Sequence, residues 1–426
     1  MGFAQGVSGL NASASNLDVI GNNIANSGTI GFKSGTAQFS DVYAGSRVGL
    51  GTQVAGVSQN FTSGAVQTSS RALDVAIVNG DGFFRLASPG GEVAYSRNGQ
   101  FNLDKDGFIV NSAGLQLTGY PVGANGGVAG GSPAPLQLPT TAMQPNSTQN
   151  IAAQFNLDSR SAVIPAATTF DASDSTTYNY ANAVTVYDSL GNSHELSTFF
   201  VKVAADAAST PPVLDNTWQV YATADGQALT SSGAIPDAAA TPPTVPGALG
   251  TLIFDGNGAL TSGGSMGFNG LAWGNGSGPS TFTLDIAGTT QFGNVNDVKK
   301  LTQDGYTSGT LTSYAINQDG TVTGKYSNEQ AKTLGQIVLS SFVNPNGLQP
   351  KGDNVWAETS ASGQPLTGTP GAGTKMGALT SGALEASNVD LTSELVNLII
   401  AQRTYQANAQ TVKTQDQVMQ TLVNMR

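Results

Sequence analysis

The chain has 426 residues, which is enough for two or three domains of about 100–200 residues each. Only 11% of the residues are charged, and 17 Lys and Arg against 28 Asp and Glu give a net charge of −11. So few positive charges cannot form a surface for nucleic acid or for an anionic membrane, and neither is expected as a partner. With no cysteine and one histidine, disulfides, thiolate chemistry and Cys/His zinc sites are excluded.

The first 26 residues carry an apolar stripe with alternating spacings of three and four, formed by Val7, Leu10, Ala14, Leu17, Gly21 and Ile24. Such a stripe predicts a helix that packs in a coiled coil. Its glycines make it a poor helix in isolation, so we expect it to order on association with other helices. The segment has neither the basic start nor the apolar run of a cleaved signal peptide.

The long middle of the chain has the alternation and turn residues of β structure. Two distant segments match in residue type, Phe101–Val110 and Tyr314–Thr323, and each predicts a strand, an Asp-Gly turn and a second strand. This pairing predicts that residues 71–146 and 291–361 build one β domain, interrupted by an inserted domain at 147–290.

The predicted insertion has a composition of its own. A hairpin is predicted from Ala183–Tyr187 and Leu196–Val203, and the Ala-, Pro- and Thr-rich stretch Ala204–Pro246 predicts a long loop. Between residues 151 and 290 there are eleven acidic and two basic residues, which gives a net charge of −9. The insertion therefore carries most of the chain's charge, as an exposed outer domain would.

Three features resemble reactive or binding sites and are discounted. Gly263–Gly267 matches the G-x-S-x-G nucleophile elbow, but it lies in a glycine-rich loop, and the one histidine, His194, precedes Ser265. Asp104–Gly107 resembles the start of a calcium loop but lacks the required Gly and Glu further on. His194 has no second His or Cys to complete a metal site and is interpreted as a surface residue. No catalytic, cofactor-binding or metal site is predicted.

The C-terminal segment carries a second stripe of the same spacing. It consists of Leu391, Leu395, Leu398, Gln402, Tyr405, Ala409, Val412, Asp416, Met419 and Val423. The helix is expected to begin near residue 388, with either Ser387 or Asp390 as its N-cap. A period of 3.5 residues at both ends favours paired terminal helices over two independent amphipathic helices. No segment approaches the roughly 20 apolar residues that span a bilayer, so membrane insertion is not expected.

Specific motifs accompany both stripes. Residues 17–26 read LDVIGNNIAN and residues 31–33 read GFK, while 382–408 contain GALEA, SNVDL and QRTYQAN. These motifs resemble the terminal signatures of the bacterial flagellar rod and hook axial protein family. The middle of the chain resembles the hook members of that family in RALDVAI from Arg71, GFF from Gly82, YSRNG from Tyr95, LTGYP from Leu117 and GDNVW from Gly352.

The resemblance implies an α+β multi-domain fold, with the terminal helices in an inner coiled-coil layer and mainly antiparallel β domains inserted between them. The expected division is 1–26 with 388–426 (helical layer), 27–70 with 362–387 (linking segments), 71–146 with 291–361 (first β domain) and 147–290 (inserted β domain). The residues expected at the polymerisation interface are Val7, Leu10, Ala14, Leu17, Ile24, Leu391, Leu395, Leu398, Tyr405, Val412 and Met419.

The family also implies a function and a location. It implies a structural subunit, not an enzyme, that polymerises into a curved hollow tube and acts as a universal joint passing torque from rod to filament. It implies export by the flagellar type III apparatus without a cleaved signal, and a place in the hook outside the cell. The implied partners are other copies of the chain, the distal rod protein, the hook cap protein, the hook–filament junction protein, the export apparatus and the hook-length control protein.

Other interpretations stay open at this point. A distal rod or hook-associated axial protein is the alternative within the same system, although the insertion argues against a rod protein. A secreted β-rich hydrolase would need a convergent acid/base pair or triad, and none is visible in the sequence. A carbohydrate-binding module would not explain heptads at both ends.

Overall fold

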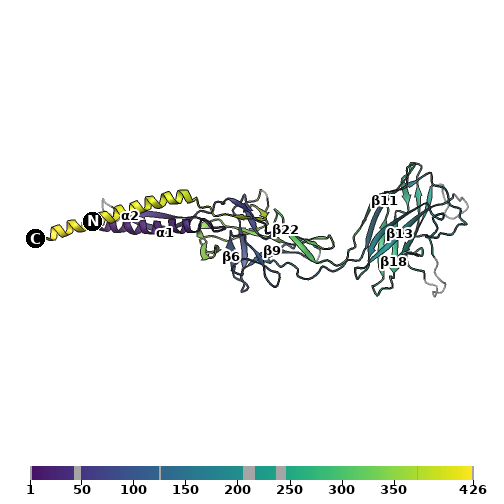
Figure 1. Cartoon of the computed structure of the whole chain (residues 1–426), viewed down its shortest axis with the longest axis horizontal. Coiled ribbons are helices and arrows are strands. Elements are labelled where there is room, and N and C mark those ends of the chain that lie inside the picture. The colour runs from purple at the N-terminus through teal and green to yellow at the C-terminus, as the bar shows by residue number, and fades with distance from the viewer. Residues whose placement is uncertain are drawn as a thin grey trace. The chain divides into compact units, whose positions relative to one another are not determined.

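The computed structural model describes residues 2–42, 49–123, 126–204, 216–236, 246–371 and 373–424, with the backbone alone at Gly2 and Leu422. The chain divides into two compact units. Unit 1 consists of Met1–Thr140, Leu311–Lys325 and Glu329–Arg426, and unit 2 of Thr141–Thr310 and Tyr326–Asn328. In the described ranges two α-helices stand near the two ends of the sequence, and the structure between them consists mainly of strands (Figure 1).

The helices belong to unit 1, where α1 (Gly2–Ala25) and α2 (Leu391–Asn424) lie side by side (Figure 1). Asp390 caps α2, because its Oδ1 accepts the backbone N–H groups of Thr392 at 2.9 Å and Ser393 at 3.3 Å. The Ser393 hydroxyl and these N–H groups lower the pKa of the Asp390 carboxyl. Asp390, and not Ser387, is therefore the N-cap.

The rest of unit 1 is β structure dominated by a 13-stranded sheet. The main path of this sheet is β22 (Leu311–Ile316), β23 (Thr321–Tyr326), β24 (Ala331–Ile337), β9 (Gln116–Pro121), β5 (Phe83–Ala87), β6 (Val93–Ser96), β27 (Val355–Ala357) and β26 (Gln349–Gly352). Its side branches are β7 (Asn102–Leu103), β8 (Ile109–Val110), β10 (Ala134–Pro135), β25 (Leu339–Ser341) and β28 (Leu366–Gly368), and a 3-10 turn, η1, spans Pro345–Gly347.

Three small antiparallel pairs complete unit 1 and join its distant segments. They are β1 (Gly35–Asp41) with β2 (Thr52–Gln59), β3 (Val66–Thr68) with β30 (Ala383–Glu385), and β4 (Val75–Val78) with β29 (Ala378–Ser381). The last two pairs bring the segment that leads to α2 against the segment that follows α1. These backbone pairings join segments from near the two ends of the sequence, so unit 1 is compact despite the insertion.

The two resembling segments form hairpins of the same 13-stranded sheet, β7–β8 and β22–β23. Each turn needs a glycine in the left-handed region, with φ +85° at Gly107 and +81° at Gly320. Asp104 Oδ1 accepts the Phe108 N–H at 2.8 Å, so this carboxylate closes a turn rather than binding calcium.

Unit 2 packs two sheets around one hydrophobic core. The five-stranded sheet holds β18 (Ser265–Leu271), β19 (Ser280–Asp285), β11 (Asn150–Asp158), β20 (Thr290–Phe292) and β21 (Asp297–Gln303). The six-stranded sheet holds β12 (Tyr180–Tyr187), β13 (Ser193–Lys202), β14 (Thr217–Ala224), β16 (Gly250–Phe254), β17 (Leu260–Ser262) and β15 (Gln227–Ala228). Pairing is antiparallel except where β11 meets β19 and β20. Phe155, Phe200, Trp218 and Phe268 from both sheets fill the core.

Two expectations about the insertion differ from the structure. Residues 141–146 and 291–310, expected in the first β domain, lie in unit 2, because β20 and β21 pair with β11 and Met143 and Asn146 form bridges with Gly309 and Tyr306. The predicted loop Ala204–Pro246 contains β14, a central strand whose Trp218 is fully buried; its residues 205–215 and 237–245 lie outside the described part of the chain. The predicted hairpin is confirmed as β12–β13.

Candidate functional site

The contact between α1 and α2 is made by small residues. A Cβ added to Gly6 would lie 2.9 Å from Val412 Cγ2, and one added to Gly9 would lie 2.9 Å from Asn408 Nδ2. Asn408 Nδ2 also donates to Ser13 Oγ at 3.4 Å. The glycines that weaken α1 as an isolated helix are thus the residues that let the two helices approach closely.

The buried stripe of α1 is shifted by one residue from the predicted stripe. The buried residues of α1 are Gly6, Ala12, Ser13, Ile20 and Asn23, and all but Ala12 stand one position before a residue of the predicted stripe. The predicted members Val7, Leu10, Ala14, Leu17 and Ile24 are half-buried. The intrachain contact therefore uses the small residues of α1 and leaves part of its larger apolar residues uncovered.

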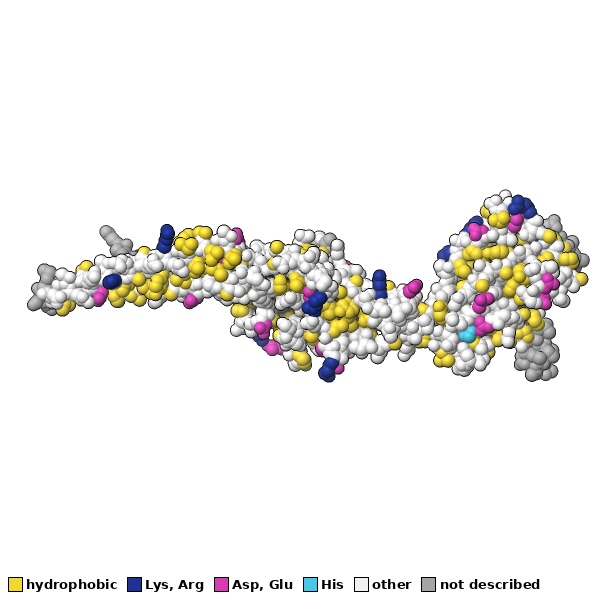
Figure 2. All heavy atoms as spheres, in the orientation of Figure 1, with side chains coloured by type: hydrophobic (Ala, Val, Ile, Leu, Met, Phe, Trp, Pro, Cys, Tyr) yellow, Lys and Arg dark blue, Asp and Glu magenta, His cyan; other side chains and the backbone are white. Residues whose placement is uncertain are grey.

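The predicted stripe of α2 is mostly open. Leu391, Leu395, Tyr405 and Met419 are exposed, and Leu398 and Val412 are half-buried. Val423 of the stripe is exposed as well, and so are four apolar residues outside the prediction, namely Val396, Ile399, Ile400 and Val418. Figure 2 shows hydrophobic side chains gathered along the helix pair. An amphipathic helix that buried its apolar face within its own chain would not leave these side chains open.

A groove of about 720 Å³ runs between α1, the β1–β2 hairpin and the first half of α2. Apolar side chains from all three elements line it, including Ile20, Ala37, Phe39 and Ile400. Among the described residues that line the groove, Glu394 is the only charged one. The sequence stripes do not reveal this groove, because one wall comes from the β hairpin.

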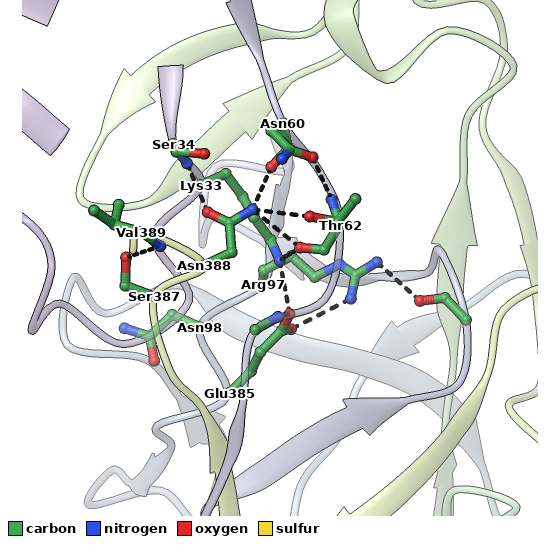
Figure 3. Close-up of polar contacts among 12 residues, drawn as sticks. Lys33, Ser34, Asn60, Thr62, Arg97, Asn98, Glu385, Ser387, Asn388 and Val389 are labelled. Carbon is green, nitrogen blue, oxygen red and sulfur yellow. Dashed lines mark hydrogen bonds and ion pairs between the residues drawn. The ribbon is translucent and has the colours of Figure 1, made fainter. Parts of the chain in front are cut away.

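A buried ion cluster connects the segment that follows α1 with the segment that precedes α2 (Figure 3). Lys33 Nζ lies 2.6 Å from Glu385 Oε1 and donates to the Thr62 carbonyl at 2.8 Å, while Arg97 Nη1 lies 3.3 Å from Glu385 Oε2. The side chains of all three ions are at most 1% exposed. One carboxylate therefore joins two cations that come from segments far apart in the sequence.

Burial sets the electrostatics of this cluster. Loss of solvent lowers the pKa of Lys33, against the opposing effect of Glu385, and it lowers the pKa of Arg97 in the same way. Arg97 also donates to the Gly80 carbonyl at 3.0 Å and lies over the Phe83 ring. Because the Lys33 side chain is closed off and already bound to a carboxylate, we interpret the cluster as a structural contact, in which the loss of one partner would leave a buried charge unpaired.

The family motifs converge at this cluster. Gly31, with φ +71°, donates its N–H to the Glu385 carbonyl at 2.8 Å, and a Cβ there would lie 2.7 Å from Asn98 N. Asn388 Oδ1 accepts the N–H of Ser34 at 2.8 Å, and its Nδ2 donates to the Asn60 carbonyl at 2.7 Å. The sequence showed these residues only as separate motifs, because a motif contains no information about which distant segment it contacts.

The single histidine lies in a different environment from the one expected. His194 is stacked on Trp273 with ring centroids 3.9 Å apart, and its side chain is only 9% exposed. Its Nδ1 lies 2.7 Å from Asp225 Oδ2 and its Nε2 lies 3.3 Å from Asp188 Oδ2. The interpretation as a surface residue was wrong, because Trp273 and Asp225, which cover the ring together with the nearby Asp188, are far from His194 in the sequence.

The structure also bears on the serine motif, on metal binding and on membrane-spanning helices. Ser265 begins strand β18, whereas a nucleophile elbow requires a helix after the serine. Within the described ranges, no three His, Asp or Glu side chains are arranged to hold a metal ion. No helix in that part of the chain is long and apolar enough to cross a membrane.

Four family models match consecutive parts of the chain. They are described as flagella basal body rod protein (residues 5–33), flagellar hook protein FlgE/F/G D1 domain (77–159), flagellar basal body protein FlaE D2 domain (156–306) and flagellar basal body rod FlgEFG protein C-terminal (380–425). The D2 match falls within unit 2. Unit 2 corresponds to the predicted insertion, whose presence argues against a rod protein.

Full-length relatives give the same result. The chain is 50% identical over 431 residues to the flagellar hook protein FlgE of Escherichia coli and 52% identical over 430 residues to that of Salmonella typhimurium, with 100% of both chains covered in each case. It is 34% identical to the hook protein of Borreliella burgdorferi, covering 99% of this chain and 98% of that protein. A solved structure of Helicobacter pylori flagellar hook protein FlgE2 aligns with a TM-score of 0.51 at 14% identity, covering 75% of this chain and 99% of the other, and supports the fold alone.

Proposed function

The chain belongs to the flagellar hook protein family and is a structural subunit of the hook, and we propose that it polymerises into a curved, hollow, flexible tube. In this proposal the tube works as a universal joint that passes torque from rod to filament. The observation that carries it is the row of uncovered apolar side chains on α2, which a monomer in water would bury if it could.

The terminal helices are proposed to form the inner coiled-coil layer of the tube, from residues 1–26 and 388–426. Segments 27–70 and 362–387 would link this layer to outer β domains. The predicted stripe residues are proposed as its interface, since the intrachain contact of Gly6 and Gly9 leaves most of the α2 members exposed. The ion cluster would then serve as the stiff connection between helices and β structure.

Export and partners follow from the family rather than from any contact in the chain. We propose export through the flagellar type III apparatus, a final place outside the cell, and contacts with the distal rod, hook cap and hook–filament junction proteins and with the hook-length control protein. A helix as rich in glycine as α1 supports an export-competent chain, because it unfolds at little cost.

Electron microscopy of the purified chain under polymerising salt tests the proposal. We expect tubes from the full chain and none from a variant that ends at Asp390, which keeps Glu385 and Asn388 in place but lacks α2. Circular dichroism should show that this variant keeps its β structure. Tubes from the shortened variant, or only monomers from the full chain, would contradict an inner helical layer.

Unit 2 is proposed to influence bending. Like charges repel, and salt screens them over about 8–10 Å, so an acidic outer unit opposes fixed contacts between neighbours while a packed apolar seam holds. The segments that lead into and out of unit 2 come together at Met143 and Gly309. These residues form an antiparallel bridge, in which the Met143 N–H donates to the Gly309 carbonyl at 2.7 Å. Replacing residues 144–308 by an Asn-Gly turn should therefore preserve unit 1.

Tubes built from that deletion variant are expected to be straight or altered in stiffness. Imaging decides between the outcomes: native curvature and flexibility would show that unit 2 does not set bending, and a complete loss of tubes would place it in the assembly core. Raising the salt concentration on full-length tubes should change their curvature, and it should not do so in the deletion variant.

A further inference from the structure

Helix α2 presents two different uncovered surfaces. Leu395, Ile399 and Arg403 follow each other at intervals of four residues and form one row, called here the ridge; Leu395 is 45% and Ile399 51% exposed. On another side, Thr404 and Ile400 form one wall of the groove, opposite Phe39 of β1. One apolar surface protrudes and the other is hollow.

Ridge and groove lie on opposite faces of the helix. A helix turns by about 100° per residue, so two positions nine residues apart differ by about 180°. Leu395 and Thr404 are nine residues apart, and so are Glu394 of the groove and Arg403 of the ridge. Within one chain Glu394 and Arg403 are also separated by about 13.5 Å along the axis, so they cannot pair with each other.

The charges of the two surfaces complement each other. Glu394 Oε2 is buried in the groove wall without a hydrogen-bond partner, although its place in the first turn of α2 favours a negative charge. Arg403 is exposed, and it makes no ion pair within the described part of the chain. A buried carboxylate oxygen without a donor is costly, and an arginine fork is the donor that suits it.

From these observations we propose that the ridge of one copy docks into the groove of the next copy, with Arg403 of the first paired to Glu394 of the second. The proposal rests on the proposed function, since it names the contact through which the polymer grows. Because the two surfaces lie on opposite faces and differ in shape, the contact is head-to-tail and leaves a free ridge and a free groove after each addition. Such a contact generates an open array rather than a closed dimer.

The proposed occupant of the groove is a second copy of this chain. The groove accepts an apolar row followed by one positive charge, and the chain carries such a row in Leu395, Ile399 and Arg403. The spacing of the row, one residue every 6 Å along the helix, suits a groove lined by another helix and a hairpin.

A charge exchange tests the pairing. Glu394→Arg and Arg403→Glu should each raise the critical concentration for polymerisation about tenfold or more, as expected for a lost charge pair at a desolvated contact. The double variant Glu394→Arg/Arg403→Glu should restore it to within about threefold of the original chain. Lys105→Glu, at an exposed turn away from the helices, is the control matched in charge and should change nothing.

Disulfide cross-linking tests the geometry independently. Because the chain has no cysteine, the introduced residues supply the only thiols. The variant Ile399→Cys/Thr404→Cys places both thiols on one helix, five residues apart, too far to bridge within a chain. On oxidation of preformed tubes we expect a ladder of covalent oligomers from the double variant. Copolymers of the two single variants should give dimers only, and tubes of Ile399→Cys alone should give no cross-links.

The outcomes separate this inference from the proposed function. Tubes that form normally without cross-links, or charge variants that the double exchange does not rescue, would overturn the ridge-and-groove contact and leave the hook function intact. A full-length chain that forms no tubes under any salt would instead contradict the proposed polymer. A ladder together with charge rescue would establish the contact.

Discussion

Unit 2 and the helix pair differ in how far their apolar side chains are buried. In unit 2, Phe200, Trp218 and Phe268 are completely buried between two sheets. In the helix pair, Ile399 and Ile400 of α2 are more than half exposed. Unit 2 therefore has the core of a finished domain, whereas the helix pair leaves apolar side chains open, which supports the proposal that another copy covers them.

Hydrogen exchange on the monomer gives the largest expected contrast between these regions. Amides of residues 2–25 and 391–424 should exchange faster than those of β13 and β14 by about a thousandfold or more, since local opening of a thinly packed helix pair costs far less than global unfolding. Mass spectrometry of peptides from a verified monomer measures this. Strong protection of both ends would show that the helices are stable without a partner molecule.

Breaking the ion cluster should destabilise unit 1 and not unit 2. Glu385→Gln removes the charge that Lys33 and Arg97 share and leaves two buried cations, which costs about 3–5 kcal/mol of the free energy of unfolding. Calorimetry should show a lower transition for unit 1 alone. The control is Glu92→Gln, whose exposed pair with Lys351 contributes at most about 1 kcal/mol; equal effects of the two changes would contradict the role of the cluster.

Acid should act on unit 2 through Asp188. Burial opposes its charge, but hydrogen bonds from Asn192, Asn275 and His194 outweigh burial and hold the pKa of Asp188 well below its usual range. A lowered carboxyl pKa stabilises the fold above about pH 4, and this stabilisation is lost as pH falls toward the lowered value. Asp188→Asn should therefore destabilise unit 2 at neutral pH and make its stability less dependent on acid.

The matched control for that change is Asp255→Asn. Asp255 closes a similar turn, accepting the N–H of Ala259 at 2.8 Å, but it is partly open to solvent and lacks the amide and histidine contacts. Chemical unfolding between pH 2 and pH 7 compares the two variants. A pH profile of Asp188→Asn that parallels the original chain would show that this carboxyl is not the acid-sensitive group.

The smallest expected effect on the monomer is that of Leu395→Ala. Because Leu395 is 45% exposed, its truncation should change the free energy of unfolding by no more than about 0.5 kcal/mol. The same change should raise the critical concentration for polymerisation, since the side chain is proposed to be buried only between copies. Unfolding of unit 1 by this substitution, with polymer lost as a consequence, would contradict the division between fold and assembly.

The sequence by itself determined the features that depend on local chemistry. The helices at both ends, the Asp-Gly turns at Gly107 and Gly320, and the hairpin β12–β13 follow from periodicity and turn residues that lie within a few positions of each other. The terminal motifs sufficed for the family, because they are long and specific. Asp390 was one of two candidate caps, and only its hydrogen bonds decided between them.

The tertiary structure decided everything that depends on distance or size. The stripes marked apolar residues, but the intrachain contact selected Gly6 and Gly9, because only small residues allow two helices to approach so closely. The strand β14 was hidden in a segment whose composition resembles a loop, since neighbouring strands supply its hydrogen bonds. Lys33 and Glu385 stand 352 positions apart, and only the folded chain brings their charges together, where burial turns an ordinary pair of residues into a strong constraint.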